Sequence, residues 1–326
     1  MNKRLKGSLM LLITAFIFGS AFVAQKSGME LLGPLAFSGI RTTMGGFVLI
    51  PVIFLMGKLR EKKDFLEEGE EKIEKTEEEK HEERKALIKG GICCGLMLFI
   101  SSSLQQIGLF YTTTGKAGFI TALYVIIVPV LGLLLKRKVR PLVWCCVFGA
   151  AAGLYFLCIP AGAGFGHINM GDVVTLFSSL GLATHLLLID HFSPKVDGVK
   201  LSCMQFFVAG IISLGVMYPV DTALGFNMPT IDSLVASAVP LLYAGVLSCG
   251  VAYTFQVIAQ AYTGPTETSL ILSLESVFAA LSGFVVLGES MTGRELFGCI
   301  VMFAVIVAAQ LPSGENKEKI KNATDG

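Results

Sequence analysis

The chain has 326 residues, of which 53% are hydrophobic and 16% are charged, with a mean hydropathy of +0.69 and a formal net charge of +1. A soluble domain has about 45–50% apolar and about 25% charged residues, so this balance excludes an ordinary soluble domain and predicts a polytopic membrane protein. We expect the lipid bilayer and no nucleic acid as a partner.

Hydrophobic segments of about 18 to 25 residues match the ~30 Å hydrocarbon core of a bilayer, because a helix rises 1.5 Å per residue. The first segment follows Lys3, Arg4 and Lys6 as a signal peptide would, but it is long for one and has a counterpart at 171–190, so we expect it to be retained. Ten membrane spans are predicted, at 7–26, 33–57, 86–110, 116–135, 141–160, 171–189, 199–219, 233–260, 265–287 and 293–311.

The last five spans carry a displaced copy of the first five. Residues 105–132 shifted by 151 positions fall on 256–283, with seven of 28 positions identical, among them the pair Gln105/Gln256. An odd number of spans per repeat inverts the second copy, and inverted repeats are typical of secondary transporters. We therefore predict an all-α membrane protein with ten transmembrane helices in two inverted five-helix repeats. The predicted parts are 1–160, 161–311 and a cytoplasmic tail at 312–326.

Basic residues predict the orientation. With the N-terminus in the cytoplasm, 22 of the 26 Lys and Arg lie on that side, including a basic run at 136–140. Only Lys26, Lys116 and Arg294 lie on the other side, and Arg41 lies within a span. Because basic residues in short loops stay in the cytoplasm, we predict a multi-pass protein of the cell membrane with both termini cytoplasmic.

The first half contains an insertion at 58–85, where the offset between the repeats drops from 164 to 151 residues. Its 12 acidic and nine basic side chains predict a charged helix that extends the third span into the cytosol. A solvated spacer is the favoured interpretation, and a docking site for a regulator is the alternative.

Small residues four positions apart mark faces where helices approach closely, at Gly91/Gly95 and at Gly149/Gly153. Packing within the chain is the favoured interpretation of these faces, and a homodimer is the alternative. Near the end of the chain, Thr292 and Glu295 have the spacing of a capping box that opens the last helix.

Two ionisable residues lie deep in spans, where each needs a partner or a function. Glu275 is about ten residues into the ninth span and Arg41 about eight residues into the second, so their depths are similar. Near an opposite charge Glu275 would stay ionised, whereas in an apolar setting it would take up a proton and could carry a coupling proton. A purely structural role for either residue remains open.

Uncharged polar residues form a second group of candidates. Interhelical hydrogen bonds are worth about 1 kcal/mol, so any one of these side chains serves packing as readily as binding. Their clustering in the third, fourth and eighth spans favours a shared site near the midplane, where Gln105 and Gln256 take symmetry-related positions. The candidates for substrate binding or coupling are Arg41, Glu275, Gln105, Gln256, Tyr124, Thr121, Tyr253, Gln25 and Gln205.

Other chemistries find little support. His185, Asp190 and His191 lack the spacing that puts two metal ligands on one helical face, so we predict no metal site. Neither a phosphate-binding loop nor a nucleophile elbow is present in the sequence, so we expect no cofactor, no direct use of ATP and no enzymatic activity.

The order of several short motifs resembles EamA-type members of the drug/metabolite transporter superfamily. The motifs are Phe18-Gly19-Ser20-Ala21-Phe22, Ile40-Arg41, Leu274-Glu275-Ser276-Val277 and Gly288-Glu289. The resemblance covers residues 7–311 and implies a carrier with a cavity between its halves and alternating access. The family pattern has proline after the residue corresponding to Glu275, whereas this chain has Ser276, so we expect the proline kink to be absent there.

Together these features favour a secondary transporter that exports small metabolites such as amino acids across the cytoplasmic membrane. The alternatives are an importer, a carrier of drug-like or lipid-linked molecules, or a polytopic protein without transport activity. The first half differs chemically from the second, because Glu275 matches Tyr124 and Arg41 matches Gln205 between the repeats. We expect cargo or proton handling where this symmetry breaks.

Overall fold

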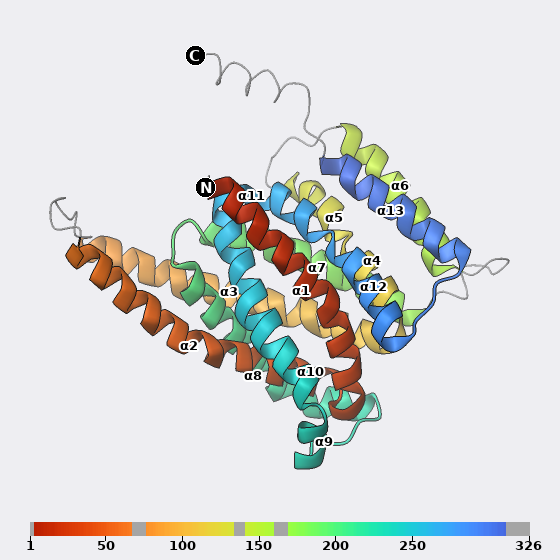
Figure 1. Ribbon diagram of the computed structural model, residues 1–326, viewed down its shortest axis with the longest axis horizontal. Helices are drawn as coiled ribbons and strands as arrows, with labels where there is room; N and C mark the ends of the chain where they lie inside the picture. Colours follow the sequence, from red (N-terminus) through yellow and green to blue (C-terminus); the bar gives the residue numbers. More distant parts are fainter. Residues whose placement is uncertain (1–2, 67–75, 134–140, 160–168, 311–326) are drawn as a thin grey trace.

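The computed structural model describes residues 3–66, 76–133, 141–159 and 169–310, and every regular element in these ranges is a helix (Figure 1). The basic run at 136–140, the tail at 312–326 and part of the charged insertion lie outside the described residues. The helices are α1 (Lys3–Leu32), α2 (Pro34–Leu66), α3 (Glu77–Tyr111), α4 (Thr114–Thr121), α5 (Tyr124–Gly132), α6 (Pro141–Cys158), α7 (Met170–Phe192), α8 (Gly198–Ala223), α9 (Ile231–Ala236), α10 (Ala238–Leu242), the π-helix η2 (Tyr243–Tyr253), α11 (Thr254–Leu272), α12 (Glu275–Leu287) and α13 (Gly293–Gln310).

Seven segments of the described chain are long and apolar enough to cross a membrane, so the protein is a multi-pass membrane protein. Ten were expected, so three are not among the seven. The predicted ninth span is divided between the end of α11 and the 13 residues of α12, the described apolar part of α6 runs only from Trp144 to Cys158, and the 18 residues of α13 include Arg294 and Glu295.

Two spans are interrupted within their apolar stretch. The fourth breaks between α4 and α5, and the ninth breaks between α11 and α12. At both breaks a leucine amide, Leu123 or Leu274, donates to the carbonyl three residues earlier at 3.2 Å, which tightens the turn locally.

No proline kink was expected in the ninth span, and the span is nevertheless broken beside Ser276. The carbonyl of Ser273 accepts from the Ser276 amide at 3.2 Å and from the Ser276 hydroxyl at 2.8 Å. Serine hydroxyls that bond back to the preceding turn bend helices, so this serine provides part of what a proline would supply. The ninth span is thus broken without a proline.

The eighth span is also irregular. It begins with the short helices α9 and α10, continues as η2 and becomes regular in α11. A π-helical segment of 11 residues is rare, and such segments occur frequently at functional sites. Sequence periodicity did not predict it.

The bundle is held by close helix contacts. α1 packs on η2, α11 and α12, whereas α3 packs on α7 and α8, and α6 pairs with α13 at one side (Figure 1). A Cβ atom at Gly95 would overlap Val208 of α8, and one at Gly153 would overlap Met302 of α13. The small-residue faces therefore serve packing within the chain, which confirms the favoured interpretation.

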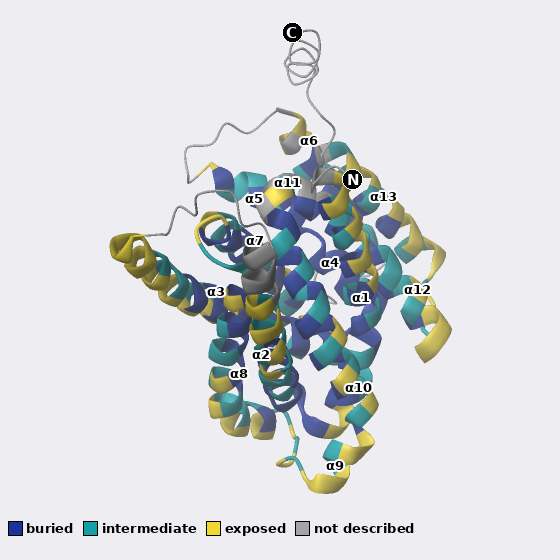
Figure 2. Cartoon of the chain, turned by 60° about the vertical axis from the view of Figure 1, so that its left-hand side comes forward, coloured by how far each residue is buried: buried dark blue, intermediate teal, exposed yellow. Residues whose placement is uncertain are grey.

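The distribution of buried and exposed residues is that expected of a protein surrounded by lipid. Buried residues concentrate along the middle of the bundle (Figure 2), while large apolar side chains such as Phe148 and Phe54 are 75% and 69% exposed on its periphery. Exposed apolar surface on this scale fits contact with lipid. The core thus encloses the polar candidates rather than presenting them to lipid.

The charged insertion was predicted to extend the third span, and its described residues divide between two helices: 58–66 continue α2 to Leu66, and 77–85 begin α3. α3 begins at Glu77 after a capping box in which Thr76 and Glu79 bond reciprocally at 2.8 and 3.2 Å. Lys80 and Lys85 pair with acidic residues one turn earlier, at 2.7 and 2.9 Å. The predicted capping box between Thr292 and Glu295 also forms, with bonds of 2.8 and 3.3 Å.

Candidate functional site

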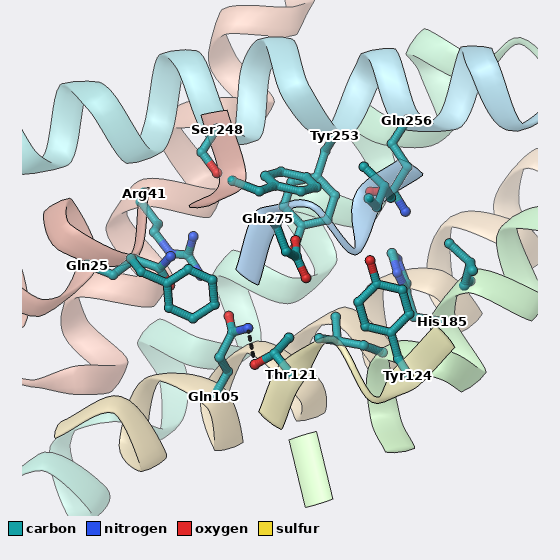
Figure 3. Close-up of a pocket in the computed structure, with 15 residues that line it drawn as sticks. Gln25, Arg41, Gln105, Thr121, Tyr124, His185, Ser248, Tyr253, Gln256 and Glu275 are labelled. Atoms are coloured by element: carbon teal, nitrogen blue, oxygen red, sulfur yellow. Dashed lines mark hydrogen bonds between the residues drawn. The ribbon is translucent and has the colours of Figure 1, made fainter. Parts of the chain in front are cut away.

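A small polar cavity lies in the middle of the bundle (Figure 3). Eight of the nine sequence-predicted residues line it: Gln25, Arg41, Gln105, Thr121, Tyr124, Tyr253, Gln256 and Glu275. Its free volume of about 50 Å³ is enough for roughly four water molecules. The cavity in this conformation therefore has little free space beyond that for solvent.

The helix breaks border this cavity. Thr121 ends α4 and Tyr124 opens α5, while Leu272 ends α11 and Glu275 opens α12, and all four residues line the cavity. Glu275 is the first residue of α12, where a carboxylate interacts favourably with the positive end of the helix dipole. The break thus helps to hold an acidic group inside the membrane span.

Arg41 and Glu275 are both buried, with exposures of 2% and 5%, and both point into the cavity (Figure 3). The Glu275 carboxyl interacts with the Tyr124 hydroxyl, its predicted repeat mate. Arg41 forms no ion pair with any described residue, and its Nε has no hydrogen-bond partner among them. Since burial excludes snorkelling to the surface, Arg41 presents an uncompensated cation to the cavity.

Side-chain amides surround these two charges, and some of their polar atoms are unused. Gln105 donates to the Thr121 hydroxyl at 3.3 Å, the one hydrogen bond drawn in Figure 3. The Oε1 atom of Gln25 is buried without a partner in the described structure. Buried polar atoms without partners are uncommon in proteins, so they mark where a bound molecule can supply the missing bond.

Gln205 is the one predicted residue that does not line the cavity. Its Oε1 lies 3.0 Å from Nε2 of His185, which does line the cavity and is 1% exposed. The sequence analysis weighed His185 only as a metal ligand and missed this position. The signal that could have identified it was its depth in an apolar span, where an imidazole needs a polar partner.

Aromatic rings form the apolar part of the wall. Phe18 and Phe22, one turn apart on α1, line the cavity, and the Phe18 ring lies 4.6 Å from that of Tyr253. His185 lies 6.4 Å from the same tyrosine ring. The cavity therefore combines a cation, a carboxyl group, amides and aromatic faces, a set that suits a small molecule with both charged and apolar parts.

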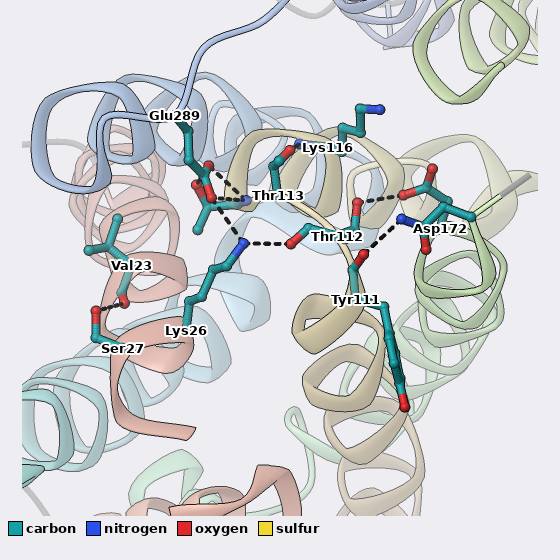
Figure 4. A network of polar contacts seen from close by, with 11 residues as sticks. Val23, Lys26, Ser27, Tyr111, Thr112, Thr113, Lys116, Asp172 and Glu289 are labelled. Atoms are coloured by element: carbon teal, nitrogen blue, oxygen red, sulfur yellow. Dashed lines mark hydrogen bonds and ion pairs between the residues drawn. The ribbon is translucent and has the colours of Figure 1, made fainter. Parts of the chain in front are cut away.

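A second polar cluster, here called the Lys26–Glu289 network, lies at one end of the bundle (Figure 4). Lys26 Nζ donates to the Thr112 carbonyl at 2.7 Å and pairs with Glu289 at 3.1 Å. Glu289 also accepts from the amide of Thr114 at 2.9 Å and from its hydroxyl. This end of α1, the start of α4 and the loop after α12 are thereby tied together.

The network sets the ionisation of its carboxyl group. Burial would raise the pKa of Glu289, but the hydrogen bonds from Thr114 and Lys26 outweigh burial and hold its pKa below the ordinary value. The carboxylate also faces the N-terminus of α4, where a negative charge is favourable. Glu289 thus acts as a structural anion at this end.

Both halves of the chain match one known protein family. The model of the EamA-like transporter family matches the chain twice, over residues 5–159 and 169–309. An uncharacterized transporter of Archaeoglobus fulgidus is 30% identical over 314 residues, which cover 94% of this chain and 87% of that protein. A solved crystal structure with 16% identity covers 93% of this chain and 96% of its own with a TM-score of 0.59, a likeness that shows the fold alone.

Proposed function

The chain belongs to the EamA-like transporter family, and from this premise we propose that it is a secondary transporter that exports small zwitterionic metabolites such as amino acids. The family is a transporter family and the Archaeoglobus relative is described as an uncharacterized transporter, so both point to membrane transport. The substrate class, the direction and the mechanism are our proposal.

One observation carries the substrate class: an unpaired, buried Arg41 and a buried Glu275 face the same cavity. A guanidinium binds a carboxylate through two parallel hydrogen bonds, so Arg41 suits the carboxylate of an amino acid. Glu275 suits its ammonium group, and the amides of Gln105 and Gln256 suit further polar atoms. An anion alone would leave Glu275 facing the like charge.

The small volume of the cavity supports alternating access. Space for roughly four waters is too little for most amino acids, so the cavity must widen toward one side before cargo enters. Two broken spans border the cavity, and discontinuous helices at the midplane are the usual place of substrate sites in secondary transporters.

We also propose that the chain consists of two inverted repeats, 1–160 and 161–311, that together contain ten spans. The two family matches fall within these ranges. The breaks also correspond, because Thr121 and Tyr124 shifted by 151 residues become Leu272 and Glu275, the residues at the second break. Corresponding helix pairs pack alike, since α5 contacts α7 as α12 contacts α1.

The orientation that we propose places both termini in the cytoplasm of a cell whose cytoplasmic membrane holds the protein, because most basic residues then lie inside. Lys26, Lys116 and Arg294 then lie at the extracytoplasmic end, which is called the outer end below. The Lys26–Glu289 network lies at this end and ties α1, the start of α4 and the loop after α12 together there.

The test begins with cells that lack or overproduce the protein, in which efflux of and resistance to a panel of amino acids are measured. The purified protein is then reconstituted in liposomes, and uptake and release of the best candidates are followed with and without an imposed pH gradient. We expect saturable flux for at least one zwitterionic solute. No specific flux for any small solute would contradict the proposal, and flux of purely anionic or lipophilic solutes alone would contradict the substrate class.

A further inference from the structure

A second recess lies between α6 and α7 near the outer end, away from the central cavity. Its free volume is about 230 Å³, and its walls include Leu154 and Tyr155 of α6, Ile159 just after that helix, and Leu176 of α7. Tyr155 and Leu176 are 43% and 39% exposed, so the recess opens on the periphery of the bundle. In a membrane hydrocarbon fills such a gap, because an empty one forfeits dispersion contacts.

One carboxylate interrupts this apolar lining. Asp172, in the first turn of α7, is 3% exposed and lines the recess. Its Oδ1 accepts a hydrogen bond from the Thr112 hydroxyl at 2.6 Å, but its Oδ2 has no hydrogen-bond partner among the described residues. The Lys116 ammonium lies in the neighbourhood and is bound to Glu295 at 2.6 Å. A buried carboxylate oxygen without a donor is costly, so it marks a place for a ligand's N–H group.

A cation lies at the same end of α6. Arg294 donates from Nε to the carbonyl of Ile159 at 3.0 Å, and its guanidinium lies 5.1 Å from the ring centres of both Tyr155 and Phe156. Ile159 and Tyr155 also line the recess, so the guanidinium borders it. A guanidinium is the side chain that best matches a phosphate group.

We propose that this recess binds a phospholipid with a primary ammonium headgroup, such as phosphatidylethanolamine. The ammonium donates to Asp172 Oδ2, the phosphate lies beside Arg294, and an acyl chain runs along Leu154 and Leu176. The polar groups lie at the helix ends and the apolar walls extend toward the middle of the bundle, which is the order of a phospholipid in its leaflet. A choline headgroup has no N–H and cannot make the bond to Oδ2.

This site is independent of the proposed cargo, and only the assignment to the outer leaflet rests on the proposed orientation. Asp172 also connects the recess with the Lys26–Glu289 network, because Thr112 donates its hydroxyl to Asp172 and accepts from Lys26 at its carbonyl (Figure 4). Lipid bound in the recess therefore acts on the same loop that the network holds.

The chain offers a direct optical test because it contains a single tryptophan, Trp144. We would introduce Leu176→Trp in a Trp144→Phe background, which places the reporter one turn from Asp172. The protein is reconstituted in vesicles in which brominated phosphatidylethanolamine or brominated phosphatidylcholine replaces part of the host lipid, and quenching gives a relative association constant. We expect a roughly 10- to 100-fold preference for the ethanolamine lipid, the effect of one hydrogen bond to a charged group, and no preference after Asp172→Asn, which keeps an acceptor for Thr112.

Two controls keep the result interpretable. Trp144 of the unmodified chain is 45% exposed near the other end of α6 and should be quenched equally by both lipids. In the reporter protein without further substitution, the N,N-dimethylated lipid keeps one N–H and should retain the preference, which the choline lipid lacks. Equal quenching by the ethanolamine and choline lipids at the reporter, or a preference that survives Asp172→Asn, would overturn the proposal.

Discussion

The central cavity and the Lys26–Glu289 network are both polar clusters inside a hydrophobic bundle, but they differ in how their charges are satisfied. In the network, Lys26 contacts a carboxylate and a carbonyl, and Glu289 accepts from an ammonium, an amide and a hydroxyl. In the cavity, Arg41 has no ion pair among the described residues. A cluster that satisfies itself holds helices together, whereas one that does not is suited to bind another molecule.

The largest expected effect is that of Arg41→Gln, which removes the uncompensated charge of the cavity. Hydrogen bonds to charged groups are worth about 1.5–3 kcal/mol, so kcat/KM for a zwitterionic substrate should fall roughly 10- to 100-fold. The kcat/KM of Arg41→Lys should lie between those of the parent and of Arg41→Gln, because lysine keeps the charge but cannot form two parallel hydrogen bonds. Flux in liposomes measures both. Parent-like flux in Arg41→Gln would remove Arg41 from the binding site.

Glu275→Gln tests the other charge of the cavity. The glutamine keeps the size and hydrogen-bonding capacity of the side chain but cannot release or take up a proton. We expect accumulation driven by a pH gradient to be abolished while exchange of labelled for unlabelled substrate continues, provided that Glu275 carries the coupling proton. Tyr124→Phe, which removes the neighbouring hydroxyl, should keep the pH dependence. A Glu275→Gln protein with unchanged pH dependence would exclude the coupling role.

Glu289→Gln should lower stability and leave substrate binding unchanged, because it weakens a cluster whose charges are paired with one another. Lys26 and Glu289 are 21% and 16% exposed at their side chains, so we expect a loss of about 1–2 kcal/mol, less than for a fully buried pair. The loss should appear as a lower Tm in detergent and as easier opening of the outer end, while the KM for substrate stays within about two-fold. A large rise in KM with an unchanged Tm in Glu289→Gln would contradict a structural role for the network and would indicate a role in substrate binding.

The smallest effect is a pH dependence of the same pair. The pKa of Glu289 is held below its ordinary value of 4.5, so its contribution to stability is fully present above that pH and is lost as the pH falls through the lowered pKa. The Tm difference between the parent and Glu289→Gln should therefore be constant from pH 8 to about pH 5 and shrink in more acidic solution. A difference that instead grows below pH 5 would contradict the assignment of a lowered pKa.

Sequence patterns predicted much of the molecule because hydropathy and helical periodicity are local properties. They predicted the helical membrane fold, the charged extension of α3 and eight residues that line one cavity, including Arg41 and Glu275. Depth in a span was enough to select these residues, since a polar group in hydrocarbon needs a reason to be there. Whether they bind cargo stays a prediction.

Other features depend on contacts that a single sequence does not reveal. Leucines at positions 123 and 274 give no local signal of a broken helix, and the π-helical segment η2 differs from an α-helix only in its hydrogen bonds. Gln205 was placed in the site as an uncharged polar residue within a span, yet its Oε1 is directed at His185. Backbone hydrogen bonds determine the breaks and η2, and side-chain pairing across helices determines the position of Gln205.

The two helix breaks have a mechanical consequence. Each interrupted span consists of two rigid rods joined at cavity depth, and the rods meet in pairs, α4 with α12 toward one end and α5 with α11 toward the other. In the alternating access proposed above, either pair would tilt about the breaks while the other stays fixed, so that the cavity opens to one side at a time.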